Sequence, residues 1–358
     1  MRPRRTIAGL GWAWCAAVIA GFVLWGIGCG REERTSQATK TGNEESRELR
    51  IVAHSPALAV ILRDLGYEPQ IVGRHAYDLV LDPKVPSCGE LGTIDYETLI
   101  RVRPTHVFIQ WGARELPERL TELAAANDWV VMNLNPLGLD EIEACAREMD
   151  EAVFAWTVGE EKKEEGMPGP GRPRHQGEGA SRGPEHAKPP MPFEEEMRRA
   201  WRDRGVGMQR AGRILLLASA KPLGAMGPGS FHHQMLERLG GVPALGAGGD
   251  DKFKAAWVTL DLEDLQKLAP DGIVIFSPRP PRTAEPEKAA TAEELIALMG
   301  RAAELNVPAI KHKRVAVIDD PLGLTPSTAM IGVADELAGI VLRWGQEQEN
   351  AEGRGGKK

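Results

Sequence analysis

Side chains that can bind a flat or metal-bearing molecule recur near the ends of predicted strands in this 358-residue chain. A tryptophan ring can press on a flat ring system, an imidazole can coordinate a metal, and a guanidinium can pair with carboxylates. The candidates are His54, Ser55, His75, Tyr77, Trp111, Met226, Trp257 and Arg279. Each also has a plainer interpretation, because such side chains pack at the rim of a core, lie solvated in loops or form surface turns. The sequence therefore predicts a binding site and leaves its ligand open.

The elements that must position these residues include a segment that occurs twice, at residues 95–109 and 261–275. Each copy opens with an aspartate, Asp95 or Asp261, of the type that caps a helix. A glutamate follows two positions later, where the helix dipole favours a carboxylate, and a proline then ends the helix before an apolar strand. Two similar α/β halves have a natural crevice between them, so we expect a ligand to bind there.

Strands alternate with helices through the part of the chain that follows residue 48. This alternation predicts an α/β fold with two Rossmann-like lobes, each with a mainly parallel sheet, joined by helical segments. The expected divisions are an N-terminal lobe (49–137), bridging helices (138–212) that contain a disordered insertion (159–192), a C-terminal lobe (213–345) and a disordered tail (346–358). We expect single helices over residues 193–208 and 327–344. Ligands bind at the carboxyl ends of strands in such sheets, and this selects the candidate residues.

The first 28 residues are predicted to be a targeting segment, because a basic start from Arg2 to Arg5 precedes an apolar run that ends at Gly28. Positive charge before the apolar run predicts that everything after it faces the periplasm or the outside. Cys29 closes an imperfect lipobox, so one interpretation is cleavage and acylation at that cysteine. The other is an uncleaved anchor, because the run is long enough to span a bilayer. In both cases a polar tether (29–48) links the folded part to a membrane.

Composition excludes several classes of protein. A net charge of −7 and a pI near 5.7 give no basic field to attract nucleic acid. Apart from Cys15 in the targeting segment and Cys29 directly after it, Cys88 and Cys145 are the remaining cysteines, which excludes a disulfide-dense scaffold and permits one bridge in an oxidising compartment. The sequence lacks the His-Glu-x-x-His motif of zinc hydrolases, and Gly205-Val206-Gly207 follows a charged helix instead of a strand. We therefore expect neither enzymatic activity nor a cofactor.

Short motifs follow one another in a specific order over residues 49–344. The first half has a strand leading into His54-Ser55-Pro56, then Val72-Gly73, a loop and helix from Gly92 to Glu97, and Arg103-Pro104 before a strand. The second half has Gly229-Ser230-Phe231, Gly240-Gly241-Val242, Trp257 ahead of the Glu263 helix, and residues 307–315. In this order and spacing the chain resembles the periplasmic substrate-binding proteins of ABC importers for cobalamin, haem and iron-siderophores, the class III type with a helical backbone.

The resemblance implies two lobes bridged by a long helix, a small hinge motion and one ligand in the cleft between the lobes. It implies that Glu97 and Glu263, one on each lobe, dock into arginine pockets of the permease. Their alternative role is to stabilise the first turns of their own helices. The resemblance also places His75 and Tyr77 in a loop where relatives carry an aromatic contact or an axial metal ligand. Trp111 and Trp257 would then press on a corrin or porphyrin ring.

The expected function is that of a monomeric, membrane-tethered protein on the extracytoplasmic face. It would capture a cobalamin, a haem or a ferric siderophore and deliver it to an ABC permease and its ATPase. The cobalt or iron would belong to the ligand and not to the protein. One alternative is a sensory or scaffolding lipoprotein that keeps the fold without transport, and a further one is a periplasmic hydrolase.

Overall fold

The computed structural model describes residues 48–165, 194–246, 251–279 and 290–355. The chain divides into a unit over residues 1–45 and a compact unit over residues 46–358, so every described residue belongs to the second unit. The predicted targeting segment, Cys29 and most of the predicted insertion lie outside the described residues. Within the described ranges, no helix combines the length and the apolar character that a membrane span requires.

The first lobe is built on a parallel sheet with the strand order β2–β1–β5–β6. Its strands are β1 (Ile51–His54), β2 (Ile71–Arg74), β5 (His106–Ile109) and β6 (Val130–Asn133), and a short hairpin, β3 (Gly89–Glu90) and β4 (Thr93–Ile94), lies outside it. Ile51, Ala53 and Phe108 pack with helices α1 (Pro56–Asp64) and α4 (Leu139–Glu165). Val52 and Val107 pack on the opposite face with α2 (Tyr96–Val102) and α3 (Glu118–Asn127). A sheet covered on both faces explains why β1 is apolar at successive positions.

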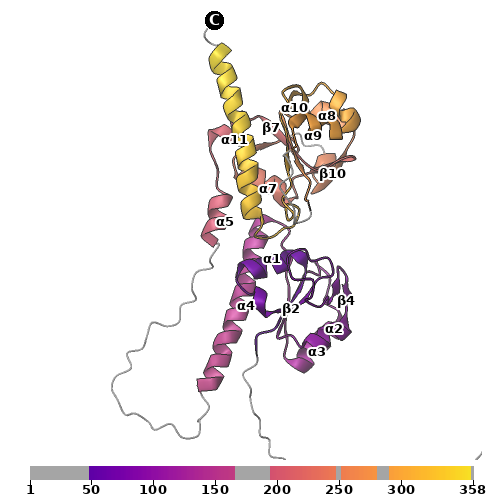
Figure 1. Cartoon of the computed structure of the whole chain (residues 1–358), viewed down its shortest axis with the longest axis vertical. Coiled ribbons are helices and arrows are strands. Elements are labelled where there is room, and N and C mark those ends of the chain that lie inside the picture. Colours follow the sequence, from indigo (N-terminus) through magenta and orange to yellow (C-terminus); the bar gives the residue numbers. More distant parts are fainter. Residues whose placement is uncertain (1–47, 166–193, 247–250, 280–289, 356–358) are drawn as a thin grey trace, which may run out of the picture. The chain divides into compact units, whose positions relative to one another are not determined.

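The second lobe has a mixed sheet in the order β10–β8–β7–β11–β12, with β9 also paired to β7. The strands are β7 (Arg213–Ala220), β8 (Leu223–Met226), β9 (Val242–Pro243), β10 (Trp257–Leu260), β11 (Gly272–Phe276) and β12 (Val315–Ile318). Strand β7 runs parallel to β9 and β11, and β11 runs parallel to β12, whereas β8 is antiparallel to both β7 and β10. The two lobes therefore have separate sheets with mainly parallel pairing (Figure 1), which confirms the predicted fold class.

Helices cover both faces of the second sheet. One face packs against α5 (Glu194–Ala200), α6 (Val206–Arg210), α7 (Phe231–Arg238) and α11 (Met330–Gly355). The other packs against α8 (Leu262–Leu268), α9 (Ala292–Leu298) and α10 (Pro308–Lys311), together with the short 3-10 helices Asp251–Phe253 and Gly300–Glu304. A third 3-10 helix, Glu68–Gln70, precedes β2 in the first lobe.

The two copies of the repeated segment have the same local structure. Asp95 caps α2 by accepting the N–H of Thr98, and Asp261 caps α8 by accepting the N–H of Asp264. Each helix ends on a left-handed residue directly before a proline, Arg103 in one copy and Ala269 in the other. The strands that follow are β5 and β11, which lie inside their sheets. The repeat is thus one helix–turn–strand unit used once in each lobe.

Three predicted boundaries are wrong. Helix α4 continues to Glu165, inside the predicted insertion, because residues 160–165 are glutamates and lysines, which favour helix. The single helix predicted over residues 193–208 is split into α5 and α6, because Gly205 takes a positive φ of 87° that interrupts a helix. Helix α11 begins at Met330 and extends to Gly355, so most of the predicted tail is helical.

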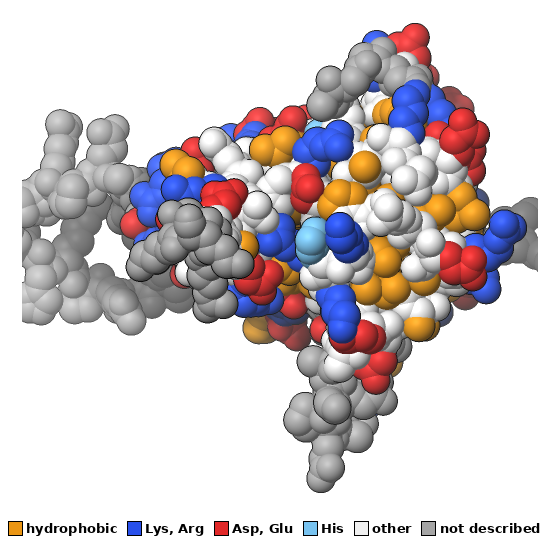
Figure 2. Space-filling model, turned by 90° about the horizontal axis from the view of Figure 1, so that it is seen from above, with side chains coloured by type: hydrophobic (Ala, Val, Ile, Leu, Met, Phe, Trp, Pro, Cys, Tyr) orange, Lys and Arg blue, Asp and Glu red, His pale blue; other side chains and the backbone are white. Residues whose placement is uncertain are grey.

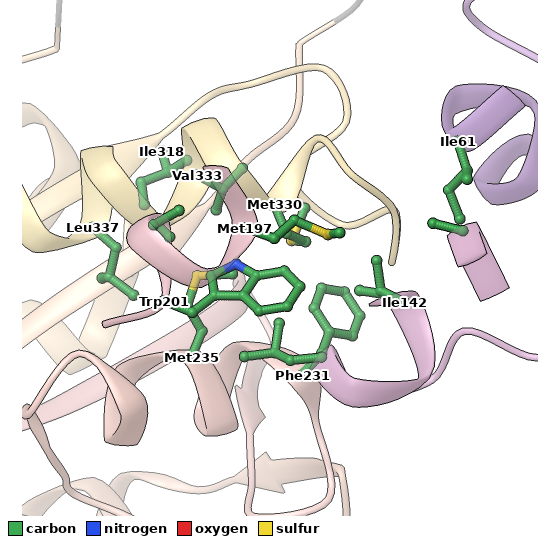
Figure 3. Packing of buried hydrophobic residues seen from close by; sticks show 14 of the residues in the cluster. Ile61, Ile142, Met197, Trp201, Phe231, Met235, Ile318, Met330, Val333 and Leu337 are labelled. Carbon is green, nitrogen blue, oxygen red and sulfur yellow. The ribbon is translucent and has the colours of Figure 1, made fainter. Parts of the chain in front are cut away.

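One continuous hydrophobic cluster includes inner-face residues of both sheets. Figure 3 shows its central part, where the Trp201 ring lies among Met197, Met235 and Phe231. Ile142 of α4 belongs to the same cluster, together with residues of α1, α7 and α11. Burial of this apolar surface is the main favourable contribution to stability, so elements from both halves of the chain contribute to one core.

Polar contacts accompany this shared core. Thr328 donates its hydroxyl to the Asp64 carboxylate at the end of α1. Gln234 of α7 accepts the N–H of Leu139, the first residue of α4, at 3.2 Å. Arg238 of the same helix pairs with Asp140 at 2.6 Å. The ends of α1 and α4 are therefore tied to the second half of the chain by side-chain hydrogen bonds.

Cys88 and Cys145 are both buried and free. Cys88 packs with Val52 and Leu99 on one face of the first sheet, whereas Cys145 of α4 packs with Phe108 on the other face. Burial raises the pKa of each thiol to about 12. The sheet separates the two sulfurs, so the bridge that the sequence permits does not form in this structure.

Candidate functional site

The parallel register of the first sheet brings the carboxyl ends of its strands to one edge. His54 ends β1 and pairs in register with Ile109, so Ser55 and Gln110 follow these two strands side by side. Ser55 donates its hydroxyl to Gln110 Oε1 at 2.7 Å. Ligands bind at this edge in open parallel sheets, and His54, Ser55 and Trp111 lie there, with His54 and Ser55 buried and Trp111 half-buried.

Trp111 is held in position by asparagines at the end of the neighbouring strand, Asn133 in its last position and Asn135 just beyond it. The backbone N–H of Trp111 donates to Asn133 Oδ1 at 2.9 Å, and the backbone N–H of Gly112 donates to Asn135 Oδ1 at 2.8 Å. The Arg114 guanidinium lies 4.8 Å from the centre of the indole ring, a cation–π distance. Sequence analysis did not select these two asparagines. Their positions at and just after the end of an apolar strand are the pattern that could have identified them.

His54, His75 and Tyr77 form a row of rings beside this edge. The rings of His54 and His75 are 5.8 Å apart and nearly perpendicular, and those of His75 and Tyr77 are 5.9 Å apart. Both histidines are buried, whereas Tyr77 is 69% exposed. Burial lowers the pKa of His54 and of His75, so both rings are neutral at neutral pH. Tyr77 is therefore the most exposed ring of this row.

The loop that carries His75 and Tyr77 is organised by Arg74, the last residue of β2. Its guanidinium donates to the carbonyl oxygens of His75 and Val85 at 2.9 Å and to those of Ala76 and Pro83 at 3.2 Å. The planar guanidinium of Arg74 thus holds both ends of a loop that has no regular secondary structure. Sequence analysis assigned no role to Arg74.

Exposed apolar side chains adjoin these residues. Tyr77 and Leu79 extend from the loop after β2, and Leu91 extends from the turn between β3 and β4 with 76% exposure. Leu91 directly follows Glu90, whose carboxylate raises the pKa of Tyr77. Apolar surface around a few placed polar groups is typical of small-molecule sites.

The second lobe separates its predicted site residues. Trp257 begins the edge strand β10 and is 54% exposed, and its ring centre lies 6.4 Å from that of His232. Met226 pairs in register with Trp257, but its side chain is 1% exposed and belongs to the core, so it presents no surface to a ligand here. Arg279 follows β11 and pairs with Asp319 at 3.2 Å. Trp257 is therefore at the surface, Arg279 is half-buried and paired with Asp319, and Met226 is buried.

The two glutamates of the repeat lie on the surface. Glu97 has a side chain that is 90% exposed and approaches Arg101 one turn later at 3.8 Å. Glu263 occupies the same position in α8 and is also exposed. Figure 2 shows one face of the molecule, on which acidic and basic side chains are interspersed, in agreement with the modest net charge.

The described residues contain no group of three or more histidine, cysteine, aspartate or glutamate side chains placed to hold a metal ion.

No family model matches the sequence, and no curated protein matches it. Solved structures do share its fold. Periplasmic haem-binding protein RhuT from Roseiflexus sp. RS-1, in apo form, is 17% identical, with 84% of this chain and 100% of that chain covered and a TM-score of 0.53.

Two further structures, both from Vibrio cholerae, are similar to the same extent. Periplasmic haem-binding protein HutB is 15% identical, with 82% of this chain and 99% of that chain covered and a TM-score of 0.54. Periplasmic vitamin B12-binding protein BtuF is 16% identical, with 84% and 97% covered and a TM-score of 0.51.

All three are named as periplasmic binding proteins. One Gly-x-Ser-x-Gly match, at residues 179–183, lies outside the described residues. The chain therefore has the two-lobed α/β fold of the periplasmic solute-binding proteins of ABC importers, as its order of motifs predicts.

Proposed function

We propose that this protein is the extracytoplasmic substrate-binding component of an ABC importer, tethered to the membrane by its N-terminal segment. The cargo is a metal chelate of the size and polarity of a cobalamin, a haem or a ferric siderophore. It binds against His75, Tyr77 and Trp111 of the first lobe and against Trp257 and Arg279 of the second. The haem- and vitamin B12-binding proteins that share the fold support this choice of cargo.

The observation that carries the proposal is the pair of equivalent, exposed glutamates, Glu97 and Glu263. Their helices do not need them as caps, because Asp95 and Asp261 already accept the first free N–H groups. In α8 the reciprocal bond of the capping box comes from Asp264, so Glu263 is not part of it. One exposed carboxylate at the same place on each lobe, outside the helix cap, is suited to contact two basic pockets of a permease.

The test is to reverse both charges and to separate docking from cargo binding. Glu97→Lys with Glu263→Lys should abolish cargo uptake by cells that lack the native copy, because like charges then face the permease. Cargo affinity of the purified variant, measured by titration with cyanocobalamin, haemin and a ferric trihydroxamate, should stay within about threefold of the parent.

The matched control reverses two exposed glutamates elsewhere, Glu122→Lys on α3 and Glu304→Lys in the second lobe, and should leave uptake intact. Uptake that survives the Glu97 and Glu263 double reversal would show that docking is assigned wrongly. Cargo binding without any dependence of uptake on the protein would instead favour a sensory role.

A further inference from the structure

The hydrogen bonding of His75 determines what this ring can offer a ligand. Its Nδ1 accepts the backbone N–H of Tyr77 at 3.1 Å. A backbone N–H can only donate, so Nδ1 uses its lone pair in this bond and the neutral ring carries its proton on Nε2. Burial lowers the pKa of His75, which keeps the ring neutral at neutral pH. The ring therefore presents an N–H donor and has no free lone pair.

This arrangement is the reverse of the one found at metal sites. A histidine that ligates a metal donates its other ring N–H to a carbonyl or carboxylate, which frees the opposite nitrogen for the metal. Here the second nitrogen accepts instead. The loop resists rearrangement, because Arg74 holds the His75 carbonyl at 2.9 Å and the N–H of Asp78 bonds the same oxygen at 3.1 Å.

Tyr77 is also poorly suited to bind a metal. A phenol coordinates iron as a phenolate, so a useful tyrosine needs its proton to leave readily. The Glu90 carboxylate raises the pKa of Tyr77, because a negative charge nearby disfavours the phenolate. The Tyr77 hydroxyl therefore keeps its proton at neutral pH.

Three other side chains that could ligate a metal, His54, His232 and Met226, are buried. His54 Nε2 is itself a buried atom without a hydrogen-bond partner, and a Cβ added on Gly89 would lie 2.9 Å from it. His232 is fully buried and its Nε2 bonds the Gly323 carbonyl at 2.7 Å. Met226 has its thioether in the core.

From this geometry we infer that the protein binds polar groups on the outer surface of its cargo and does not coordinate the metal of the cargo. His75 Nε2–H donates to an oxygen on the outside of the chelate. This inference rests on the proposed function and narrows its cargo. The favoured class is a chelate whose metal already has a complete ligand set and whose outer surface carries carboxylate, amide or hydroxamate oxygens. A haem with an open axial position does not fit this class.

The test compares three probes on the purified full-length chain: cyanocobalamin, ferrioxamine B and ferric haem. At least one of the first two should bind with an unchanged visible spectrum, because its metal keeps its own ligands. His75→Phe, which removes the donor at similar volume, should weaken that binding by about tenfold, the usual effect of losing one hydrogen bond to a polar partner. His75→Gln, whose amide N–H can replace Nε2–H, should restore affinity to within about threefold, and thermal melting of both variants checks folding.

Each other outcome is decisive. Ferric haem that binds with an imidazole- or phenolate-ligated spectrum, lost in His75→Gln or Tyr77→Phe, overturns the inference and leaves the proposed function standing. A saturated chelate that binds equally well to His75→Phe overturns the donor role. Failure of all three probes to bind overturns the inference together with the proposed function.

Discussion

His106 lies in β5 with no exposed surface, between the rings of Phe108 and Trp156, whose centres are 5.9 Å and 5.8 Å from its own. Burial lowers the pKa of His106 to about 4. In the unfolded chain a histidine titrates near its ordinary value of about 6.5. Below that pH His106 becomes protonated in the unfolded chain but stays neutral in the folded one. Stability is therefore lost as the pH falls from about 6.5 to about 4, and the loss then levels off.

We predict that acidification through this window lowers the free energy of unfolding by up to about 3 kcal/mol for His106 alone. His232, whose pKa burial also lowers to about 4, should add a loss in the same direction. Urea unfolding at pH 7 and pH 4.5 measures the total. His106→Phe should flatten the dependence, whereas replacing the exposed His312 by Gln should not, and a slope unchanged by His106→Phe would contradict this account.

At the scale of single elements, α8 tests how much the repeated aspartate contributes. Asp261→Ala removes the side chain that accepts the Asp264 N–H at 2.8 Å, so we predict a loss of about 1 kcal/mol. Asp261→Asn keeps an acceptor and should lose much less. Glu263→Ala, two residues later, should change stability by less than about 0.5 kcal/mol if its role lies outside the fold. Chemical denaturation of the three variants gives the comparison, and equal losses would refute the assignment of the cap.

The contact between β11 and α11 gives a second element-scale prediction. A Cβ on Gly272 would lie 2.5 Å from Trp344 Cζ3, which is closer than atoms can approach. Gly272→Ala should therefore destabilise the protein by about 1–3 kcal/mol through overpacking. Adding Trp344→Phe, which shortens the opposing ring, should restore part of the loss. A double mutant no more stable than Gly272→Ala alone would show that the clash is relieved in another way.

The same scale shows what the sequence reveals about elements and what it does not. Helices α2 and α8 were predicted with their caps, because an aspartate before an amphipathic run is a local pattern. Strand β8 was not predicted, since Leu223-Gly224-Ala225-Met226 has no β-branched residue and is a strand only because β7 and β10 pair with it. Pairing between distant segments is tertiary information that a local pattern does not contain.

The site was predictable to a similar degree. Strand ends correctly located His54, Ser55 and Trp111, because parallel strands bring their carboxyl ends to one edge. The burial of Met226 and the hydrogen bond that occupies His75 Nδ1 depend on the direction of single side chains. Periodicity does not fix these directions at a loop or a sheet edge.

At the scale of the whole described chain, one hydrophobic cluster joins residues from Ile51 to Trp344. We therefore predict that residues 46–358 unfold in a single cooperative transition, in which far-ultraviolet circular dichroism and tryptophan fluorescence coincide. Ile142→Ala, in the part of the cluster supplied by α4, should lower the single midpoint by the equivalent of about 2–5 kcal/mol without splitting it. Two separated transitions would mean that the lobes are independently stable.

The two sheltered thiols have a practical consequence for biogenesis. Because Cys88 and Cys145 lie on opposite faces of one sheet, these two cysteines need no thiol oxidase or disulfide isomerase for the protein to reach its native state. The protein should therefore mature equally well in a reducing cytosol and in an oxidising envelope. Alkylating reagents cannot reach the two sulfurs while the chain is folded and would label them only when it unfolds. The rate of alkylation therefore reports how often the protein unfolds.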